Sequence, residues 1–317
     1  MIGTGDVTER KSGPAFNKVP GSRLVAVSNR TVSKAEDYAN RHGIEKVYSN
    51  PQELIEDPKV DAVYVATPPD AHRDYALDCI EAGKTVYLEK PMARTYEECR
   101  EINLAAGKAG VKVYVAYYRR SLEYFRKVKE LAGTRLGRIL QIQMLQYFPA
   151  RQEDLDPDNL PWRVIPQISG GGYFHDMGCH ALDILFYIFG DPVQVRGTAL
   201  NRGGLYEADD TLTASLVLGE GIPLSAGWSF VIPEFSQKDQ VMVTGEQGSL
   251  SFSVFSFDPI NLHTPASPEE FNTLQPEHIQ QPFIRDMVEE IQGTGRCPST
   301  GETAAVTSLV MDRICSK

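Results

Sequence analysis

The chain has 317 residues, a formal net charge of −10 and a hydrophobic content of 42%. This length predicts one large or two ordinary domains, and the composition is typical of a soluble globular protein. The acidic balance, without any block of Lys and Arg, argues against binding to nucleic acid or to an anionic membrane. The longest apolar stretch, residues 181–189, contains Asp183 and is too short to span a bilayer.

The chain opens without a basic-then-apolar signal segment. Its five cysteines are scattered and form no C-x-x-C pair. An odd, scattered set in a chain of this length is typical of reduced thiols, so we predict a cytoplasmic protein.

A short glycine motif lies at the start of the sequence. Gly3 and Gly5 supply the first two glycines of a G-x-G-x-x-G dinucleotide turn, and Thr8 stands where the third glycine or alanine usually falls. Such a turn normally follows a full strand, and here only two residues precede it, so we expect residues to be missing upstream. Pro14 lacks an amide hydrogen, and we expect the Gly13-Pro14 pair to break the first helix early.

The second predicted strand, residues 23–28, ends in Ser28-Asn29-Arg30-Thr31. An NAD site usually places an Asp or Glu here to bind the ribose 2′-hydroxyl, while an Arg favours a 2′-phosphate. No acid occurs at positions 28–31, Arg30 is present, and Lys34 follows one helical turn later. We therefore predict a preference for NADP over NAD. In the alternative, Arg30 is only a solvated loop residue.

Helix and strand patterns alternate as far as residue 115. The order predicts right-handed crossovers and an α/β Rossmann-type, doubly wound parallel sheet, in which the weak glycine signal becomes a credible dinucleotide site. The expected elements are helices at 33–43, 71–82 and 95–108, a short helix opening at Asn50-Pro51, and strands at 60–66, 85–88 and 111–115.

The strand at residues 85–88 ends abruptly in Glu89-Lys90-Pro91. Glu89 and Lys90 then lie at the carboxyl end of the strand, where open α/β sheets bind their ligands. Pro91 keeps Lys90 out of the α region, so the direction of the lysine is set. A surface ion pair at the start of a loop is the alternative for these residues.

After Tyr117 the apolar spacing changes from helical to alternating. We predict a dinucleotide-binding domain at residues 1–117 and a second domain at residues 118–317, of α+β type with a large, mostly antiparallel sheet. One face of that sheet is apolar, and the other is partly polar and available to another subunit. The expected elements are a helix at 122–131, strands near 140–144, 212–218, 224–230 and 241–252 with a hairpin at 245–248, and helices near 277–292 and 302–314.

Three glycines, Gly170-Gly171-Gly172, allow a close backbone approach and precede a helix expected to run to Phe189. On this helix Asp176, His180 and Asp183 have i, i+4, i+7 spacing and share one face. Two carboxylates beside an imidazole orient the ring and favour its charged form, which suits a general acid/base. One alternative is a buried, hydrogen-bonded histidine. The other is a metal site at His175, Asp176 and His180, which is disfavoured because His175 and His180 are five residues apart and would diverge on a helix.

The Glu89-Lys90-Pro91 motif, the triple glycine and the Asp176…His180…Asp183 run together resemble the glucose–fructose oxidoreductase/inositol dehydrogenase (Gfo/Idh/MocA) family, over essentially the whole chain. The resemblance implies a two-domain NAD(P)-dependent oxidoreductase acting on a sugar, cyclitol or related polyol. It implies that Lys90 contacts substrate hydroxyls and cofactor, that His180 is the acid/base, and that Asp176 orients the substrate or His180. It also implies a cis peptide before Pro91.

The residue patterns and the resemblance give one set of predicted site residues. The predicted catalytic residues are Lys90, His180 and Asp176. The predicted cofactor-binding residues are Gly3, Gly5, Asp6, Val7, Asn29, Arg30, Thr67, Pro68, His72, Glu89 and Lys90. The predicted substrate-binding residues are Lys90, Tyr118, Arg119, Trp162, Arg163, Asp176 and His180. No metal ligand is predicted, and the expected partners are a carbohydrate-like substrate and further copies of the chain, in a homodimer or homotetramer through the C-terminal sheet.

Two other functions remain open at this point. One is an NAD-dependent glycosidase that uses transient oxidation to activate elimination. The other is a non-catalytic regulator that senses a dinucleotide or a sugar. Such a regulator need not keep Lys90, Asp176 and His180, and all three are present here.

Overall fold

The computed structural model describes residues 1–315 and divides into two compact units. Residues 1–122 and 276–305 form the first unit, and residues 123–275 with the chain from 306 onward form the second. The predicted division had placed everything after Tyr117 in the second domain. Residues 276–305 instead return to the first unit, because α9 (Gln281–Ile291) is apolar on one side. The Phe283 ring on this helix stacks on Tyr87 at 5.6 Å between centroids.

A parallel sheet forms the centre of the first unit. Strand β1 (Ala26–Ser28) pairs with β2 (Lys46–Tyr48), and β3 (Ala62–Val65), β4 (Thr85–Leu88) and β5 (Val113–Val115) pair in that order. Ile2 joins the two groups, because it forms parallel bridges to both Ser28 and Val65. The predicted Rossmann-type sheet is confirmed, with its first strand reduced to this bridge.

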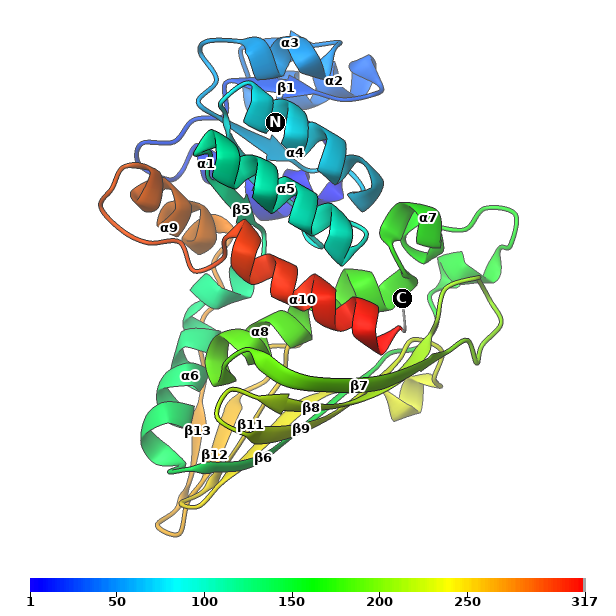
Figure 1. Ribbon diagram of the computed structural model, residues 1–317, viewed down its shortest axis with the longest axis vertical. Helices are drawn as coiled ribbons and strands as arrows, with labels where there is room; N and C mark the ends of the chain where they lie inside the picture. The colour runs from blue at the N-terminus through cyan, green and yellow to red at the C-terminus, as the bar shows by residue number, and fades with distance from the viewer. Residues whose placement is uncertain (316–317) are drawn as a thin grey trace. The chain divides into compact units, whose positions relative to one another are not determined.

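Helices connect the strands of the first unit. In Figure 1, α4 and α5 run side by side over the sheet, and α9 packs near α1. Thr95 caps α5 by accepting a hydrogen bond from the Glu98 amide, and Asn50 caps α3 in the same way. The bounds are α1 (Gly13–Phe16), α2 (Val32–His42), α3 (Pro51–Glu56), α4 (His72–Glu81) and α5 (Tyr96–Ala109), with short turns η1 (Thr8–Ser12), η2 (Pro69–Ala71) and η3 (Tyr118–Ser121).

The first helix is not broken at Gly13-Pro14, so that prediction was wrong. Residues 8–12 form a π-helix, η1, and α1 follows without a gap. The Gly13 amide donates to the Thr8 carbonyl five residues back, which shifts the hydrogen-bond ladder just before the proline. Pro14 then occupies the first turn of α1, where no amide hydrogen is needed.

The second unit is built on an eight-stranded sheet in the order β13-β12-β11-β10-β6-β9-β8-β7. β6 and β9 pair in parallel, and the other neighbours pair antiparallel, including the predicted β10–β11 hairpin. The predicted large, mostly antiparallel sheet is therefore confirmed. The strands are β6 (Ile139–Tyr147), β7 (Pro192–Leu200), β8 (Thr211–Leu218), β9 (Ile222–Ser229), β10 (Lys238–Gly245), β11 (Ser249–Phe252), β12 (Ile260–His263) and β13 (Pro268–Phe271).

The two faces of this sheet differ in composition. Leu212, Leu216 and Val241 belong to the buried face, over which α6 (Glu123–Arg135) and α8 (Cys179–Phe189) lie in Figure 1. The opposite face carries short polar side chains that alternate with the buried ones and are exposed, namely Gln143, Thr213, Ser215, Ser225 and Gln240. The remaining α- and π-helices are α7 (Pro166–Ser169), η6 (Phe174–Gly178) and α10 (Gly301–Ile314), and short 3-10 turns form η4 (Gln152–Leu155), η5 (Trp162–Val164) and η7 (Glu234–Ser236). No helix in the described part of the chain is long and apolar enough to cross a membrane.

Candidate active site

The Gly3-Thr4-Gly5 turn is closely packed at its first glycine and open at its second. Gly3 has φ +94°, and a Cβ there would lie 2.6 Å from the Ala66 carbonyl oxygen, so the turn packs closely on the end of β3. A Cβ at Gly5 would meet nothing within 4 Å, so the backbone there faces open space, as the approach of a pyrophosphate requires. Thr8, in place of the third glycine, is buried and donates its hydroxyl to the Gly5 carbonyl at 2.7 Å, which braces the turn.

Asn29 connects the end of β1 to this turn. Its side-chain amide donates to the Thr4 hydroxyl at 2.7 Å, and its side-chain oxygen accepts from the Thr31 amide at 2.9 Å. Asn29 therefore stands where an NAD site usually carries an acid. The next residue, Arg30, is exposed, and the structure shows no ion pair between it and any described residue.

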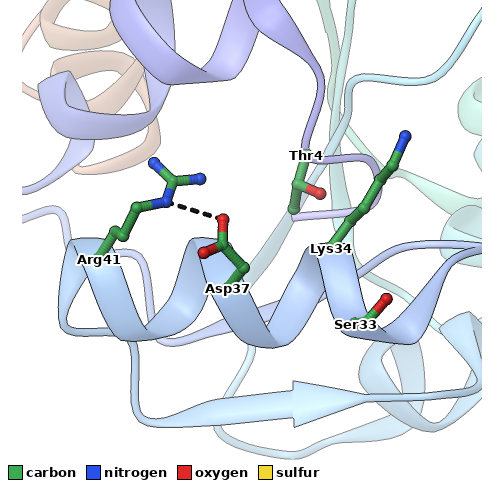
Figure 2. A pocket seen from close by; sticks show the side chains of 5 residues that line it. All are labelled: Thr4, Ser33, Lys34, Asp37 and Arg41. Atoms are coloured by element: carbon green, nitrogen blue, oxygen red, sulfur yellow. Dashed lines mark hydrogen bonds and ion pairs between the residues drawn. The ribbon is translucent and has the colours of Figure 1, made fainter.

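A polar hollow of about 310 Å³ lies beside the same turn, and Figure 2 shows the side chains that line it, those of Thr4, Ser33, Lys34, Asp37 and Arg41. Arg41 is held in place, because its guanidinium lies 2.8 Å from Asp37 and 2.7 Å from Glu9. The hydrogen bonds from Arg41 lower the pKa of the Glu9 carboxyl to about 2. Lys34 is exposed, extends away from Asp37 and Arg41 in Figure 2, and makes no ion pair with the residues described.

Glu89, directly after β4, is a buried carboxylate with three hydrogen-bond donors. The Tyr64 hydroxyl donates to it at 2.5 Å, the Gln280 side-chain amide at 2.7 Å and the Lys90 backbone amide at 3.2 Å. Burial and the Glu89 charge hold the pKa of Tyr64 well above its usual range, so Tyr64 is the donor. Glu89 therefore fixes the backbone at Lys90 from inside the first unit. The peptide between Lys90 and Pro91 is cis, as the resemblance implied.

His72 is fully buried, and both of its ring nitrogens face backbone carbonyl oxygens. Nδ1 lies 3.0 Å from the Pro91 oxygen, and Nε2 lies 2.8 Å from the Thr67 oxygen. Burial lowers the pKa of this imidazole. The sequence pattern had assigned His72 with Thr67 and Pro68 to direct cofactor binding, whereas the ring is turned toward the protein interior.

The predicted substrate residues Tyr118 and Arg119 lie in η3, where both are buried. The Arg119 guanidinium lies 5.1 Å from the centre of the Tyr118 ring. Their proposed contact with substrate stays a prediction.

In the second unit, the triple glycine allows a left-handed residue and two close contacts. Gly170 ends α7 in the left-handed region at φ +90°. A Cβ at Gly171 would lie 2.4 Å from the His175 ring, and one at Gly172 would lie 2.6 Å from the Ala208 Cβ. The glycines therefore let the segment close onto its own His175, whose Nδ1 lies 3.1 Å from the Gly171 oxygen.

Residues 174–178 form the π-helix η6, so ideal α-helical spacing does not hold between Asp176 and His180. The Arg163 Nε lies 3.2 Å from the Asp176 carboxylate, and the guanidinium lies 4.7 Å from the centre of the Trp162 ring. The structure thus brings three of the predicted substrate residues, Trp162, Arg163 and Asp176, into one cluster.

His180, in the first turn of α8, is 5% exposed. Its ring packs edge-on against Phe255 at 5.9 Å between centroids. Asp183, one turn later, is also buried and accepts a hydrogen bond from the Thr307 hydroxyl at 3.4 Å. Among the described residues, no group of three or more His, Cys, Asp or Glu side chains lies close enough to hold a metal ion.

Comparison with known proteins decides the family. Residues 1–117 match the family described as "Oxidoreductase family, NAD-binding Rossmann fold", and residues 125–251 match the "GFO/IDH/MocA C-terminal domain". The chain belongs to the Gfo/Idh/MocA family. It is therefore an oxidoreductase that depends on a nicotinamide dinucleotide, and the recognition made from the sequence is confirmed.

Individual relatives of this Gfo/Idh/MocA protein cover nearly its whole length. Oxidoreductase P35 of Formosa agariphila is 37% identical, over 99% of this chain and 97% of its own. The 1,5-anhydro-D-fructose reductase of Ensifer adhaerens is 28% identical, over 90% of this chain and 85% of its own. The crystal structure of aldose-aldose oxidoreductase from Caulobacter crescentus, complexed with glycerol, is 25% identical and has a TM-score of 0.81, over 95% of this chain and 91% of its own.

Two partners of the site residues were missed by sequence reasoning. Gln280, which binds Glu89, lies 191 positions further along the chain, and no local pattern connects the two. The bracing role of Thr8 was also missed, because a threonine at a glycine position was taken only as a departure from the motif. Its hydroxyl, buried beside the turn, gives the role.

Proposed function

We propose that this Gfo/Idh/MocA protein transfers a hydride between NADP(H) and a sugar, cyclitol or related polyol or keto-sugar. The observation that carries the proposal is the position of Lys90, whose backbone is fixed at the carboxyl end of β4 in the unit that also holds the Gly3-Thr4-Gly5 turn. A cation at that edge of the sheet suits an oxygen that gains negative charge. The carbohydrate class is supported by the relative named for reduction of an anhydro-sugar.

Each site residue has a role in this proposal. Bound NADP(H) supplies or accepts the hydride. Lys90 stabilises the alkoxide that develops on the substrate oxygen, and His180 gives or takes the proton at that oxygen. The Trp162–Arg163–Asp176 cluster offers a flat ring, a cation and a carboxylate, which together suit a ligand rich in hydroxyl groups.

A reductase screen tests the function. The purified protein is incubated with NADPH and a panel of keto-sugars and anhydro-sugars, and NADPH consumption is followed by absorbance, with NADH used on every hit. Turnover with a keto-sugar is the expected result. Cleavage of glycosides without net consumption of reduced cofactor would favour the glycosidase instead, and NADPH binding without turnover on any sugar would favour a sensing protein.

The NADP preference is expected to depend on the two exposed cations near β1 and α2. The Arg30→Ala, Lys34→Ala double variant should raise the KM for NADPH by about tenfold or more, because a charge-assisted contact to a 2′-phosphate is lost. The KM for NADH should change by less than about twofold, since NADH has no phosphate there. Steady-state kinetics with both cofactors measure the difference.

A matched control removes a cation elsewhere in the same unit. Lys108 is exposed near the end of α5, and Lys108→Ala should leave both KM values unchanged. Equal effects of the double variant on NADPH and NADH would contradict the assignment of Arg30 and Lys34 to the 2′-phosphate.

We also propose that the exposed face of the large sheet joins copies of the chain. This face carries neutral, short side chains along β8 and β9, which another sheet can approach closely. The Thr213→Lys, Ser225→Lys double variant should convert a dimer or tetramer into a monomer, because two like charges would be buried in each copy. Light scattering after size-exclusion chromatography measures the mass. Leu104→Lys, on α5, is the control and should leave the mass unchanged. A monomeric wild-type protein would contradict the proposal.

A further inference from the structure

We propose that His72 is a positioning residue that holds the loop after β3 and the Lys90–Pro91 segment together, and so links cofactor affinity to the placement of Lys90. The inference rests on the proposed function for the role of Lys90. It rests on the geometry of the first unit for the connection between the two loops.

The two loops leave neighbouring strands at the same edge of the sheet. β3 and β4 pair in parallel, with Val65 opposite Leu88 in the last paired row. Thr67 follows β3 by two residues, and Pro91 follows β4 by three. The His72 ring, at the start of α4, lies between the carbonyl oxygens of these two residues. One side chain therefore reaches both segments to which the sequence assigns site residues.

These carbonyl oxygens have few other ways to find a donor. The amides that follow each carbonyl by one turn have other acceptors: the Ala71 amide donates to the Pro68 carbonyl at 3.2 Å, and the Arg94 amide donates to the Glu98 carboxylate at 3.0 Å. A buried carbonyl without a donor is costly, and the histidine supplies the missing donor. Each loop faces its own ring nitrogen, with Nδ1 at the Pro91 oxygen and Nε2 at the Thr67 oxygen. A neutral ring donates to one of the two carbonyls, and a charged ring donates to both.

His72 acts through the two loops and not by touching a ligand. Its side chain has no exposed surface, and both nitrogens are directed at the protein backbone. Next to the second loop, Glu89 accepts the Lys90 amide hydrogen. The Lys90–Pro91 segment is thus held at one end by a carboxylate and at the other by an imidazole.

Two conservative variants separate the two bonds. Asparagine places its amide nitrogen near the position of Nδ1, and glutamine places it near Nε2. His72→Gln should keep the bond to Thr67 and lose the bond to Pro91, so kcat should fall about tenfold while the Kd for NADPH stays within about twofold. His72→Asn should do the reverse, raising the Kd for NADPH about tenfold at nearly unchanged kcat. Fluorescence titration gives Kd, and saturating kinetics give kcat.

A control and a second readout make the test decisive. Ala76→Gly weakens α4 at a buried position without touching either carbonyl, so it should lower Tm and leave kcat and Kd unchanged. Hydrogen exchange of peptides covering residues 66–70 and 89–94 follows each loop without turnover. His72→Gln should speed exchange in the second peptide, and His72→Asn should speed it in the first.

Equal changes in kcat and Kd in both variants, or equal exchange in both peptides, would overturn the proposal in favour of a general packing role. Each variant makes its own prediction, so one folded variant is enough. If the wild-type protein reduces no sugar, the proposed function fails. The hydrogen exchange of the two peptides in the two variants still supports or refutes the connection made by His72.

Discussion

Replacing Lys90 by methionine should lower kcat by about 10³-fold or more, because the variant keeps the length of the side chain and loses the cation beside the developing alkoxide. The Kd for NADPH should stay within about threefold, since the Gly3-Thr4-Gly5 turn and the Asn29 contacts are untouched. Absorbance kinetics on a substrate from the screen measure kcat, and fluorescence titration measures Kd. The backbone at residue 90 should remain fixed, because Glu89 accepts the Lys90 amide hydrogen, which the variant keeps.

The control for this variant is Lys108→Met, at an exposed position on α5. This control also replaces a lysine by methionine, but near the last turn of α5 instead of at the carboxyl end of β4. The kcat of the control variant should equal that of the wild type. A Lys90→Met enzyme with wild-type kcat would remove the lysine from the mechanism.

His180→Ala should lower kcat by about 10²-fold to 10⁴-fold, the usual loss when a general acid/base is removed. The residue is almost fully buried, so truncation also leaves a cavity and should reduce Tm. His180→Asn fills more of the space and restores part of the Tm, but it cannot transfer the proton, so its kcat should stay low. This pair separates chemistry from packing.

His263, exposed on β12, provides the control for loss of a histidine. His263→Ala should leave kcat and Tm unchanged. Recovery of wild-type kcat in His180→Asn would mean that the residue serves packing or hydrogen bonding alone, and another proton donor would have to be found.

Lys90 and His180 belong to different units, so a double-mutant cycle tests whether they act on one step. If they stabilise the same transition state, the double variant should lose much less than the product of the two single losses. Fully multiplicative losses would mean that the two residues act independently.

The first unit could be predicted from sequence because its signals are local. Runs such as Thr85–Leu88 are apolar over the length of one strand, and caps such as Thr95 sit next to the helices that they start. The same holds for the large sheet, where alternation along β8 records which face is buried. Patterns of this kind need only neighbouring residues, and they gave the fold class. The family came instead from the resemblance carried by Glu89-Lys90-Pro91 and by the segment from Gly170 to Asp183.

The parts that could not be predicted depend on distant residues or on altered helical geometry. No periodicity in the sequence connects Gln280 to Glu89, or marks the return of residues 276–305 to the first unit. The widened turns η1 and η6 change which residues face each other, and a pattern based on 3.6 residues per turn cannot register them. For this reason the break at Pro14 was wrongly expected, and the spacing from Asp176 to His180 was read as regular.

The late return of the chain has a consequence for biosynthesis. Inside the first unit, Glu89 depends on Gln280, and the Arg120 guanidinium donates to the Pro298 carbonyl at 2.7 Å. During translation these early residues leave the ribosome long before their partners exist, so the nucleotide half stays incomplete until almost the entire polypeptide has been made. The strands of the C-terminal sheet all precede residue 272, so this sheet can form before the last segment of the nucleotide half has been synthesised.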